Sequence, residues 1–319
     1  MILIKGFANS GSEARWDMIV AITGGTGLIG RHLTALLERK GVEVRILSRR
    51  PDAAVQWDPG QHRMSPGALD GVHAVVHLAG ESVAGRWTEE KKAQINQSRR
   101  QAAEFLAEQI KAANLRPVVV SASAIGYYGD RGQNWLSESD GSGSGFLAET
   151  TVAWEASLGR LTDVASRNVV LRIGVVLASQ GGALPQMAAP VRMGMGSALG
   201  SGEQFVSWIH IDDLVRLFAI AIDRTLDKSA ILSGDLSGVY NAVAPLPVTN
   251  AELLQAIAAT LGKPFFLPRV PGFVLKLILG QMSDMVLDST RVASDRISST
   301  GFTFQFPQLQ SALSSLLKN

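Results

Sequence analysis

Thr23-Gly24-Gly25-Thr26-Gly27-Leu28-Ile29-Gly30 is the stretch of this sequence that decides the fold. It follows the apolar run 18–23, which predicts a buried strand, and it precedes apolar residues that recur at helical spacing. An early glycine permits a tight turn, a middle one lets a pyrophosphate approach the backbone, and the last lets the helix pack on the strand. Because strand, turn and helix stand in register, a dinucleotide-binding turn is favoured over an ordinary glycine-rich turn.

The residues on either side of the turn predict how it holds a cofactor. The N-terminus of a helix offers unpaired N–H groups and a partial positive charge to phosphates. We therefore expect the cofactor to contact Gly24, Thr26, Gly27, Leu28, Ile29 and Gly30.

The second predicted strand, residues 42–47, indicates which cofactor is bound. An NAD site usually places Asp or Glu at the end of this strand, whereas here Ser48-Arg49-Arg50 follows it. Arg49 and Arg50 suit a 2′-phosphate, so NADP(H) is favoured over NAD. The alternative is a pair of solvated arginines.

Composition excludes several classes of function. The chain has 319 residues, a formal net charge of +2, 46% apolar residues and no cysteine. Disulfides, thiolate catalysis and cysteine–zinc sites are therefore excluded, the five histidines lack metal-ligand spacing, and no metal is expected. The low density of Lys and Arg predicts no nucleic-acid partner. No apolar run approaches the roughly 18 residues of a membrane helix, so we expect a cytoplasmic protein without a membrane partner.

The order of predicted elements indicates a doubly wound parallel α/β sheet of the Rossmann type with a smaller C-terminal substrate region. Residues 1–17 look like a disordered extension, because a second methionine, Met18, precedes the first strand. Residues 18–180 alternate predicted strands and helices, with later return segments near 206–245. Residues 181–319 are assigned mainly to the substrate region. They begin with an irregular, glycine-punctuated segment that is typical of functional loops.

Further motifs resemble the extended branch of the short-chain dehydrogenase/reductase superfamily, which includes nucleotide-sugar epimerases and dehydratases. They are His77-Leu78-Ala79-Gly80, Ser121-Ala-Ser123-Ala-Ile-Gly-Tyr127-Tyr128-Gly129, Leu171–Leu177, Trp208–Asp213 and Tyr240–Ala244. The resemblance implies that Leu78, Ala79, Gly80, Glu81 and Ser121 also line the cofactor site, and that Ser123 is the family serine.

A narrower set of motifs resembles one atypical group, the bacterial and mitochondrial "epimerase family" proteins. These motifs are Gly80-Glu-Ser82, Arg86-Trp-Thr88, Lys91-Lys92, Ser98-Arg99, Tyr127-Tyr128, Gly145-Phe-Leu-Ala148 and Trp154-Glu155. The resemblance runs from Met18 to the C-terminus. It implies NADP(H) binding but no particular substrate, and some members of the group have been labelled cell-division inhibitors.

The chain departs from the superfamily at the catalytic pair, which is Tyr-x-x-x-Lys on a helix. At the family spacing this chain has Phe146 and Thr150, so both the proton donor and the cation that tunes it are missing. The candidates that remain for catalysis are Ser123, Tyr128 and Tyr127. Each has a structural alternative, a local cap for Ser123 and loop packing for the tyrosines.

Other polar residues carry weaker hypotheses. Glu81 and Glu138 are acids expected near the pocket, although a lone loop carboxylate is more often solvated. His210 with Asp212 and Asp213 resembles a segment that fastens the two domains together, and His77 is expected in the core.

Two functions follow. The first is an NADP(H)-dependent oxidoreductase or epimerase-like enzyme that acts on a small hydroxyl or carbonyl compound, including nucleotide-sugar-like compounds. The alternative is a non-catalytic NADP(H)-binding sensor or regulatory protein, linked to cell division in the manner that the resemblance implies. The expected partner is an unidentified small molecule, and the chain is expected to be a monomer or a homodimer, with residues 98–111 as a candidate face.

Overall fold

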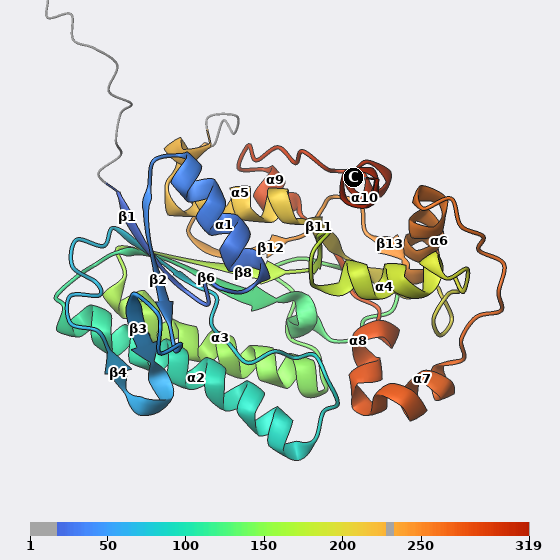
Figure 1. Ribbon diagram of the computed structural model, residues 1–319, viewed down its shortest axis with the longest axis horizontal. Coiled ribbons are helices and arrows are strands. Elements are labelled where there is room, and N and C mark those ends of the chain that lie inside the picture. Colours follow the sequence, from blue (N-terminus) through green and yellow to red (C-terminus); the bar gives the residue numbers. More distant parts are fainter. Residues whose placement is uncertain (1–17, 228–232, 319) are drawn as a thin grey trace, which may run out of the picture.

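The computed structural model describes residues 18–227 and 233–318, so the predicted extension at 1–17 lies outside the described residues. One sheet of eight strands forms its centre (Figure 1). In spatial order the strands are β12 (Gly238–Ala242), β8 (Arg167–Ile173), β6 (Val118–Ala124), β5 (Ala74–His77), β1 (Ile19–Thr23), β2 (Glu43–Ser48), β3 (Val55–Asp58) and β4 (Arg63–Met64). All neighbours pair in parallel except β3 and β4. The predicted Rossmann-type parallel sheet is confirmed.

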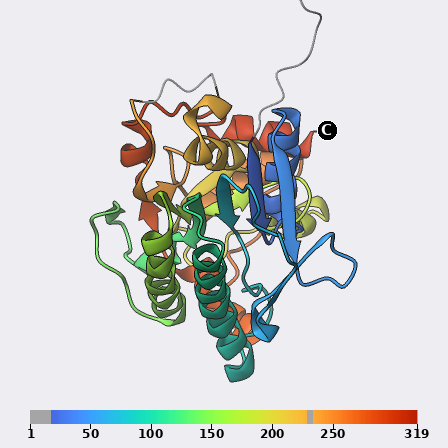
Figure 2. The same ribbon diagram turned by 90° about the vertical axis from the view of Figure 1, so that its left-hand side faces the viewer.

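Helices cover both faces of this sheet, as the end-on view shows (Figure 2). Helices α1 (Leu28–Arg39) and α5 (Ile211–Ile222) pack together on one face, and α2 (Glu89–Ala112) and α3 (Phe146–Val164) pack together on the other. Thr88 is the N-cap of α2, because its hydroxyl accepts a hydrogen bond from the Lys91 N–H at 3.2 Å. Strand residues such as Val20, Ile22, Val75 and Val119 are fully buried between these layers.

Two stretches of the chain that are rich in turn residues contain regular elements. The polar segment after β2 contains the short strands β3 and β4, which extend the sheet beyond β2. Trp57 anchors them, since its ring is buried against His77 and Phe105. The glycine-punctuated segment after residue 181 contains α4 (Ala183–Arg192), bounded by Gly182 and Gly194, both with positive φ.

The C-terminal region has a hydrophobic cluster of its own, built around Leu184, Trp208, Leu253 and Leu313. Its helices are α6 (Asn250–Thr260), α7 (Gly272–Leu279), α8 (Asp284–Leu287), α9 (Asp295–Ser298) and α10 (Leu309–Leu317), and η4 (Gly280–Ser283) joins α7 to α8. Three two-stranded pairs accompany them: β9 (Val175–Leu177) with β11 (Trp208–His210), β10 (Phe205–Val206) with β13 (Val248–Thr249), and β7 (Trp135–Leu136) with β14 (Arg291–Val292).

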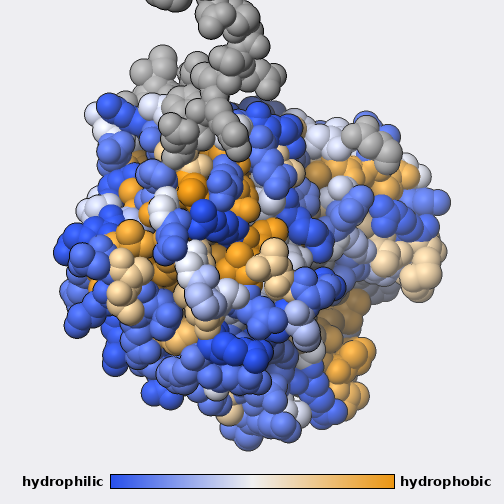
Figure 3. Space-filling view, turned by 60° about the vertical axis from the view of Figure 1, so that its left-hand side comes forward, coloured by the Kyte–Doolittle hydropathy of each residue, from blue (hydrophilic) through white to orange (hydrophobic). Residues whose placement is uncertain are grey.

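The surface over the sheet domain is mainly hydrophilic, with smaller hydrophobic areas exposed between the charged side chains (Figure 3). Within residues 18–227 and 233–318, no helix is long and apolar enough to cross a bilayer.

Candidate functional site

The glycine turn lies where the order of strands in the sheet reverses. Strand β1 pairs with β2 on one side and with β5 on the other, so the chain proceeds outward in opposite directions from this point. Ligands of open α/β sheets bind in the crevice at such switch points, outside the carboxyl ends of the strands. The loops that follow β1 and β5 therefore define the candidate site.

Three glycines of the turn have distinct steric roles. Gly24 has a φ of +72°, and a Cβ there would lie 2.8 Å from the carbonyl carbon of Leu78 in the loop after β5. A Cβ on Gly30 would lie 2.5 Å from the Gly25 Cα, so α1 packs directly on the turn. Gly27 is exposed, and a Cβ there would meet only the Gly24 oxygen, at 3.3 Å. At Gly27, therefore, the absence of a side chain leaves space for a ligand rather than for the protein itself.

The start of α1 is open to an anion. Gly27 is its N-cap, no side chain caps the helix, and its first turn holds no acidic residue. The exposed Thr26 contributes its carbonyl oxygen, which accepts a hydrogen bond from Arg31 at 3.1 Å. Leu28 contacts the segment before α4, because a Cβ on Gly182 would lie 3.0 Å from its Cδ2. The glycine-rich segment thus reaches the edge of the cofactor turn.

The two arginines after β2 differ. Both are exposed, but Arg50 forms hydrogen bonds of 3.2 Å to each carboxylate oxygen of Asp52. Arg49, by contrast, makes no hydrogen bond or ion pair with any residue that the structure describes. Its positive charge contributes to lowering the pKa of Glu81, after the larger effect of Lys91, so this charge lies near the loop after β5. Arg49 is therefore the arginine with its donors available to a ligand.

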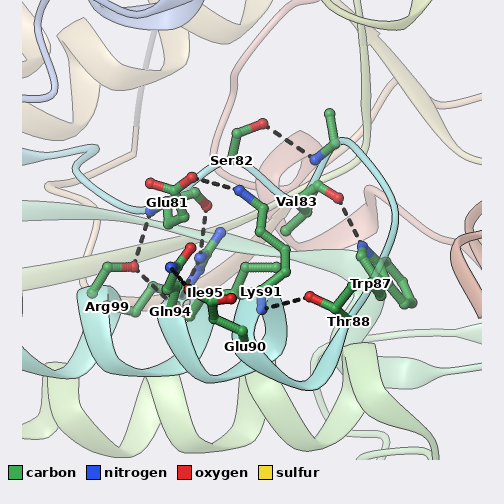
Figure 4. Close-up of polar contacts among 12 residues, drawn as sticks. Glu81, Ser82, Val83, Trp87, Thr88, Glu90, Lys91, Gln94, Ile95 and Arg99 are labelled. Atoms are coloured by element: carbon green, nitrogen blue, oxygen red, sulfur yellow. Dashed lines mark hydrogen bonds and ion pairs between the residues drawn. The ribbon is translucent and has the colours of Figure 1, made fainter.

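The loop after β5 is fastened to α2 by a series of polar contacts (Figure 4). The Glu81 N–H donates to Ser98 at 3.0 Å, and its carbonyl oxygen accepts from Arg99 at 2.9 Å. The Glu81 carboxylate accepts from Lys91, and this hydrogen bond is the main reason why its pKa is lowered. Glu81, one of the acids expected near the pocket, is thus paired with Lys91 and helps to hold the loop against α2.

Arg99 is a buried cation beneath this loop. A Cβ on Gly80 would lie 3.4 Å from its side chain, and its guanidinium lies 4.8 Å from the centre of the Trp154 ring. Its hydrogen bonds go to the backbone oxygens of Glu81 and Ile95. Burial lowers the pKa of Arg99 to about 10. This positive charge under Gly80 was not predicted as a site residue, although Ser98-Arg99 was among the group motifs.

Ser123 belongs to a buried network that sequence reasoning missed. Its hydroxyl donates to Glu155 Oε1 at 2.6 Å, and Arg172 holds both oxygens of the same carboxylate at 2.8 Å. Burial alone would lower the pKa of Arg172, but its hydrogen bonds to Glu155 and Tyr128 raise it above its usual value. Ser123 is therefore oriented by an ion pair between α3 and β8.

The two candidate tyrosines both contact Arg172, but they differ in how far they are exposed to solvent. Tyr128 is fully buried; its hydroxyl donates to Asn241 at 2.8 Å and accepts from Arg172 at 3.0 Å. Burial raises the pKa of Tyr128, which makes it a poorer acid. Tyr127 is half-buried, and its ring lies 3.5 Å from the Arg172 guanidinium carbon. Among the described residues its hydroxyl has no hydrogen-bond partner, so Tyr127 is the tyrosine that a substrate can reach.

The residues at the two positions of the missing catalytic pair, Phe146 and Thr150, take part in packing instead. Phe146 makes an edge contact with Trp87 at 4.9 Å between ring centres, and Thr150 is buried with no hydrogen-bond partner for its hydroxyl among the described residues. Phe146 also borders an open groove of about 590 Å³. Glu89 and Lys92 of α2, Glu149 of α3 and Asp284 of α8 line it.

The other predicted residues have structural roles. Ser121 is fully buried beside His77, its register partner, and its hydroxyl has no hydrogen-bond partner among the described residues. His77 lies in the core, bonds to the Thr23 hydroxyl at 2.8 Å, and has its pKa lowered to about 4 by burial. Glu138 accepts a hydrogen bond from the Asn241 N–H at 2.7 Å.

The His210 segment joins the two parts of the molecule, as expected. The His210 ring stacks on Phe306 and lies 3.1 Å from the Ser315 hydroxyl, and Asp213 accepts hydrogen bonds from the N–H groups of Gln305 and Phe306. In the part of the chain that the structure describes, no group of His, Asp and Glu could hold a metal ion.

Known proteins resemble the chain over nearly its whole length. The profile of the NAD dependent epimerase/dehydratase family matches residues 20–233, and a domain of unknown function (DUF1731) matches residues 270–316. The chain is 36% identical to the chloroplastic epimerase family protein SDR39U1 homolog of Arabidopsis thaliana, over 96% of this chain and 89% of the relative. It is 34% identical to the epimerase family protein YfhF of Bacillus subtilis, over 94% and 98%.

A solved structure extends the comparison to three dimensions. The crystal structure of human epimerase family protein SDR39U1 (isoform 2) with NADPH superposes with a TM-score of 0.84 at 34% identity. The match covers 95% of this chain and 100% of the human chain.

Proposed function

The chain belongs to the NAD-dependent epimerase/dehydratase family, and from that premise we propose that it is an NADP(H)-dependent oxidoreductase or epimerase-like enzyme acting on a small hydroxyl or carbonyl compound. The observation that carries the proposal is the uncapped start of α1 at Gly27, set at the switch point of the sheet. NADPH in the similar human structure supports the choice of cofactor.

The residues divide the work between holding the cofactor and orienting the substrate. Gly27 and the first N–H groups of α1 hold the pyrophosphate, and Arg49 pairs with the 2′-phosphate. When bound, NADP(H) supplies hydride transfer. Ser123, whose proton goes to Glu155, accepts a hydrogen bond from a substrate hydroxyl, and Tyr127 is the accessible hydroxyl that exchanges its proton.

The test is turnover by purified protein with NADPH across a broad panel of aldehydes, ketones and nucleotide sugars. Tyr127→Phe should lower kcat by about 100-fold or more, the range that a general acid contributes. Tyr240→Phe is the matched control, because the Tyr240 hydroxyl lies outside the network of Ser123, Glu155 and Arg172 and, among the residues that the structure describes, only accepts a hydrogen bond from the Ser237 N–H. Absence of turnover across the panel, with NADPH bound, would remove the enzymatic proposal while leaving the cofactor proposal intact.

The alternative is a non-catalytic NADP(H)-binding regulator, and one observation favours it. Phe146 packs on Trp87 where the family's acid should be, and Thr150 carries no charge. In that case NADPH should alter partner binding without being consumed. Pull-downs performed with and without NADPH measure this directly, and identical sets of partners would contradict the regulatory function.

A further inference from the structure

The segment from Phe266 to Ile278 exposes an unusual concentration of large apolar side chains. Phe266 is 75% exposed, Phe273 74%, Leu277 83% and Ile278 69%. We call these four, with the partly exposed Leu267, the apolar ridge. Exposed apolar groups that gather in one segment mark interaction surfaces, whereas scattered ones need no explanation.

Helix α7 turns its apolar residues outward. Phe273 and Leu277 are four residues apart and thus share one side of the helix, while Leu275 is its one buried residue. An ordinary surface helix would bury this apolar face and expose polar residues. Here α7 lies at the edge of the molecule, at the opposite end from β3 and β4 (Figure 1).

The charged residues of this segment are all positive. Lys263, Arg269 and Lys276 are exposed, and the sequence from 253 to 283 contains no acidic residue. The acids that follow it are Asp284 and Asp288, and Lys276 lies close enough to Asp288 to oppose the rise that burial causes in its pKa. Lys263 and Arg269 make no ion pair with any residue that the structure describes, so the segment suits an occupant that is apolar where the ridge inserts and negatively charged beside it.

We propose that the apolar ridge docks onto an anionic lipid bilayer surface, with Phe273, Leu277 and Ile278 inserted at the headgroup boundary and the three cations over the headgroups. Apolar side chains on one face with Lys and Arg beside them are the signature of interfacial helices. With eight residues, α7 is about 12 Å long, against a hydrocarbon core of ~30 Å, so it lies in the interface rather than across it.

A second copy of the chain fits this surface less well. A two-fold interface would bring the same patch of both molecules together, and with it six positive charges and no carboxylate from this segment. The proposal also revises the sequence-based expectation of no membrane partner. That expectation considered only spanning helices and did not consider which face of a short helix is turned outward.

The test is flotation of the full-length protein with two kinds of vesicle, one of phosphatidylcholine alone and one that also contains about 30% phosphatidylglycerol, which makes the vesicle surface negative. Wild-type protein should bind the anionic vesicles, and the double variant Phe273→Ser/Leu277→Ser should bind at least tenfold more weakly. Replacing Lys263, Arg269 and Lys276 by Gln should weaken binding on the order of fivefold per cation and abolish its salt dependence. Val152→Ser, an exposed apolar residue of α3, is the control and should bind as wild type does.

Three results would overturn the proposal. One is no binding of the wild type to anionic vesicles. Another is equal binding of the wild type and the double variant. The third is a wild-type dimer, measured by analytical ultracentrifugation, that dissociates in the double variant while neither protein binds vesicles; this would assign the ridge to a second copy. Thermal melting of each variant checks that it is folded.

Discussion

Glu155 joins the residues at the centre of the candidate site. Its carboxylate accepts hydrogen bonds from Ser123 and from two nitrogens of Arg172, and both charged side chains are largely buried. Removal of one partner from a buried ion pair leaves an uncompensated charge.

Glu155→Gln should therefore lower the free energy of unfolding by about 3 kcal/mol, at the lower end of the range for buried pairs because the site is not fully dry. Urea denaturation measures this. Glu104→Gln is the matched control, because Glu104 pairs at 3.4 Å with an exposed Arg160 and should change stability by less than about 1 kcal/mol. Equal losses in the two variants would contradict the account of the network.

A pH dependence follows from His77. Burial lowers its pKa to about 4 in the folded protein, while the unfolded chain titrates near 6.5. Between these values the unfolded state binds more protons, so stability is complete above pH 6.5 and falls as the pH drops toward 4. At pH 5 the loss should be about 2 kcal/mol.

His77→Asn removes this titration and keeps a polar group for Thr23. We measure its free energy of unfolding in urea at pH 7 and at pH 5. The decrease between these two pH values should be about 2 kcal/mol smaller in the variant than in the wild type. Parallel curves for the two proteins would show that His77 is not buried in its neutral form.

The sequence predicted the residues of the turn but not those of the network. Thr23–Gly30 is a contiguous signal whose steric logic can be read directly. Ser123, Glu155 and Arg172 come from β6, α3 and β8, and only the packing of α3 on the sheet brings them together. The absence of Tyr-x-x-x-Lys was visible in the sequence, whereas the full burial of Tyr128 and the half-buried position of Tyr127 were not.

At the scale of elements, long periodic segments were predicted well and short ones were not. Helices α1, α2, α3, α5 and α6 each combine an apolar face with a cap or a glycine, which are the signals by which a helix is recognised in a sequence. Strands β3 and β4 are too short to show a period of two, and the turn residues around them predict a loop. Helix α4 was missed because Gly182 and Gly194, which bound it, are also loop signals.

Two glycines of the strand–turn–helix unit should respond differently to alanine. Gly30→Ala places a Cβ 2.5 Å from backbone and should cost roughly 1–3 kcal/mol or more in stability, as overpacked sites do. Gly27→Ala keeps an ordinary extended backbone and brings its Cβ only to 3.3 Å from the Gly24 oxygen, a contact that a small shift relieves, so it should fold and weaken NADPH binding instead. Thermal melting and NADPH titration of both variants separate the two effects, and a stable Gly30→Ala protein would contradict the packing argument.

At the scale of the whole molecule, a buried carboxylate ties the C-terminal segment to the sheet domain. Asp213 of α5 accepts hydrogen bonds from the Gln305 and Phe306 N–H groups and from Arg216, and its side chain is 1% exposed. Hydrogen bonds to a charged group are worth about 1.5–3 kcal/mol each.

Asp213→Asn should therefore loosen the segment around 305–306, with amide exchange there at least tenfold faster, measured by hydrogen–deuterium exchange. The neighbouring Asp212→Asn is the control, because the Asp212 side chain is 55% exposed and should leave exchange unchanged. Unchanged exchange in Asp213→Asn would show that the hydrophobic cluster alone holds the two parts together.

The central claim is that this chain retains an NADP(H)-binding site, formed by the glycine turn and Arg49, while the usual catalytic pair is replaced by Phe146 and Thr150. Its most direct test is calorimetric titration of the purified protein with NADPH and NADH, repeated on Arg49→Ala. NADPH should bind about tenfold or more tightly than NADH, as expected for one charge-assisted contact to the 2′-phosphate, and Arg49→Ala should remove that preference. Equal affinities in the wild type, or an undiminished preference for NADPH in Arg49→Ala, would contradict the account.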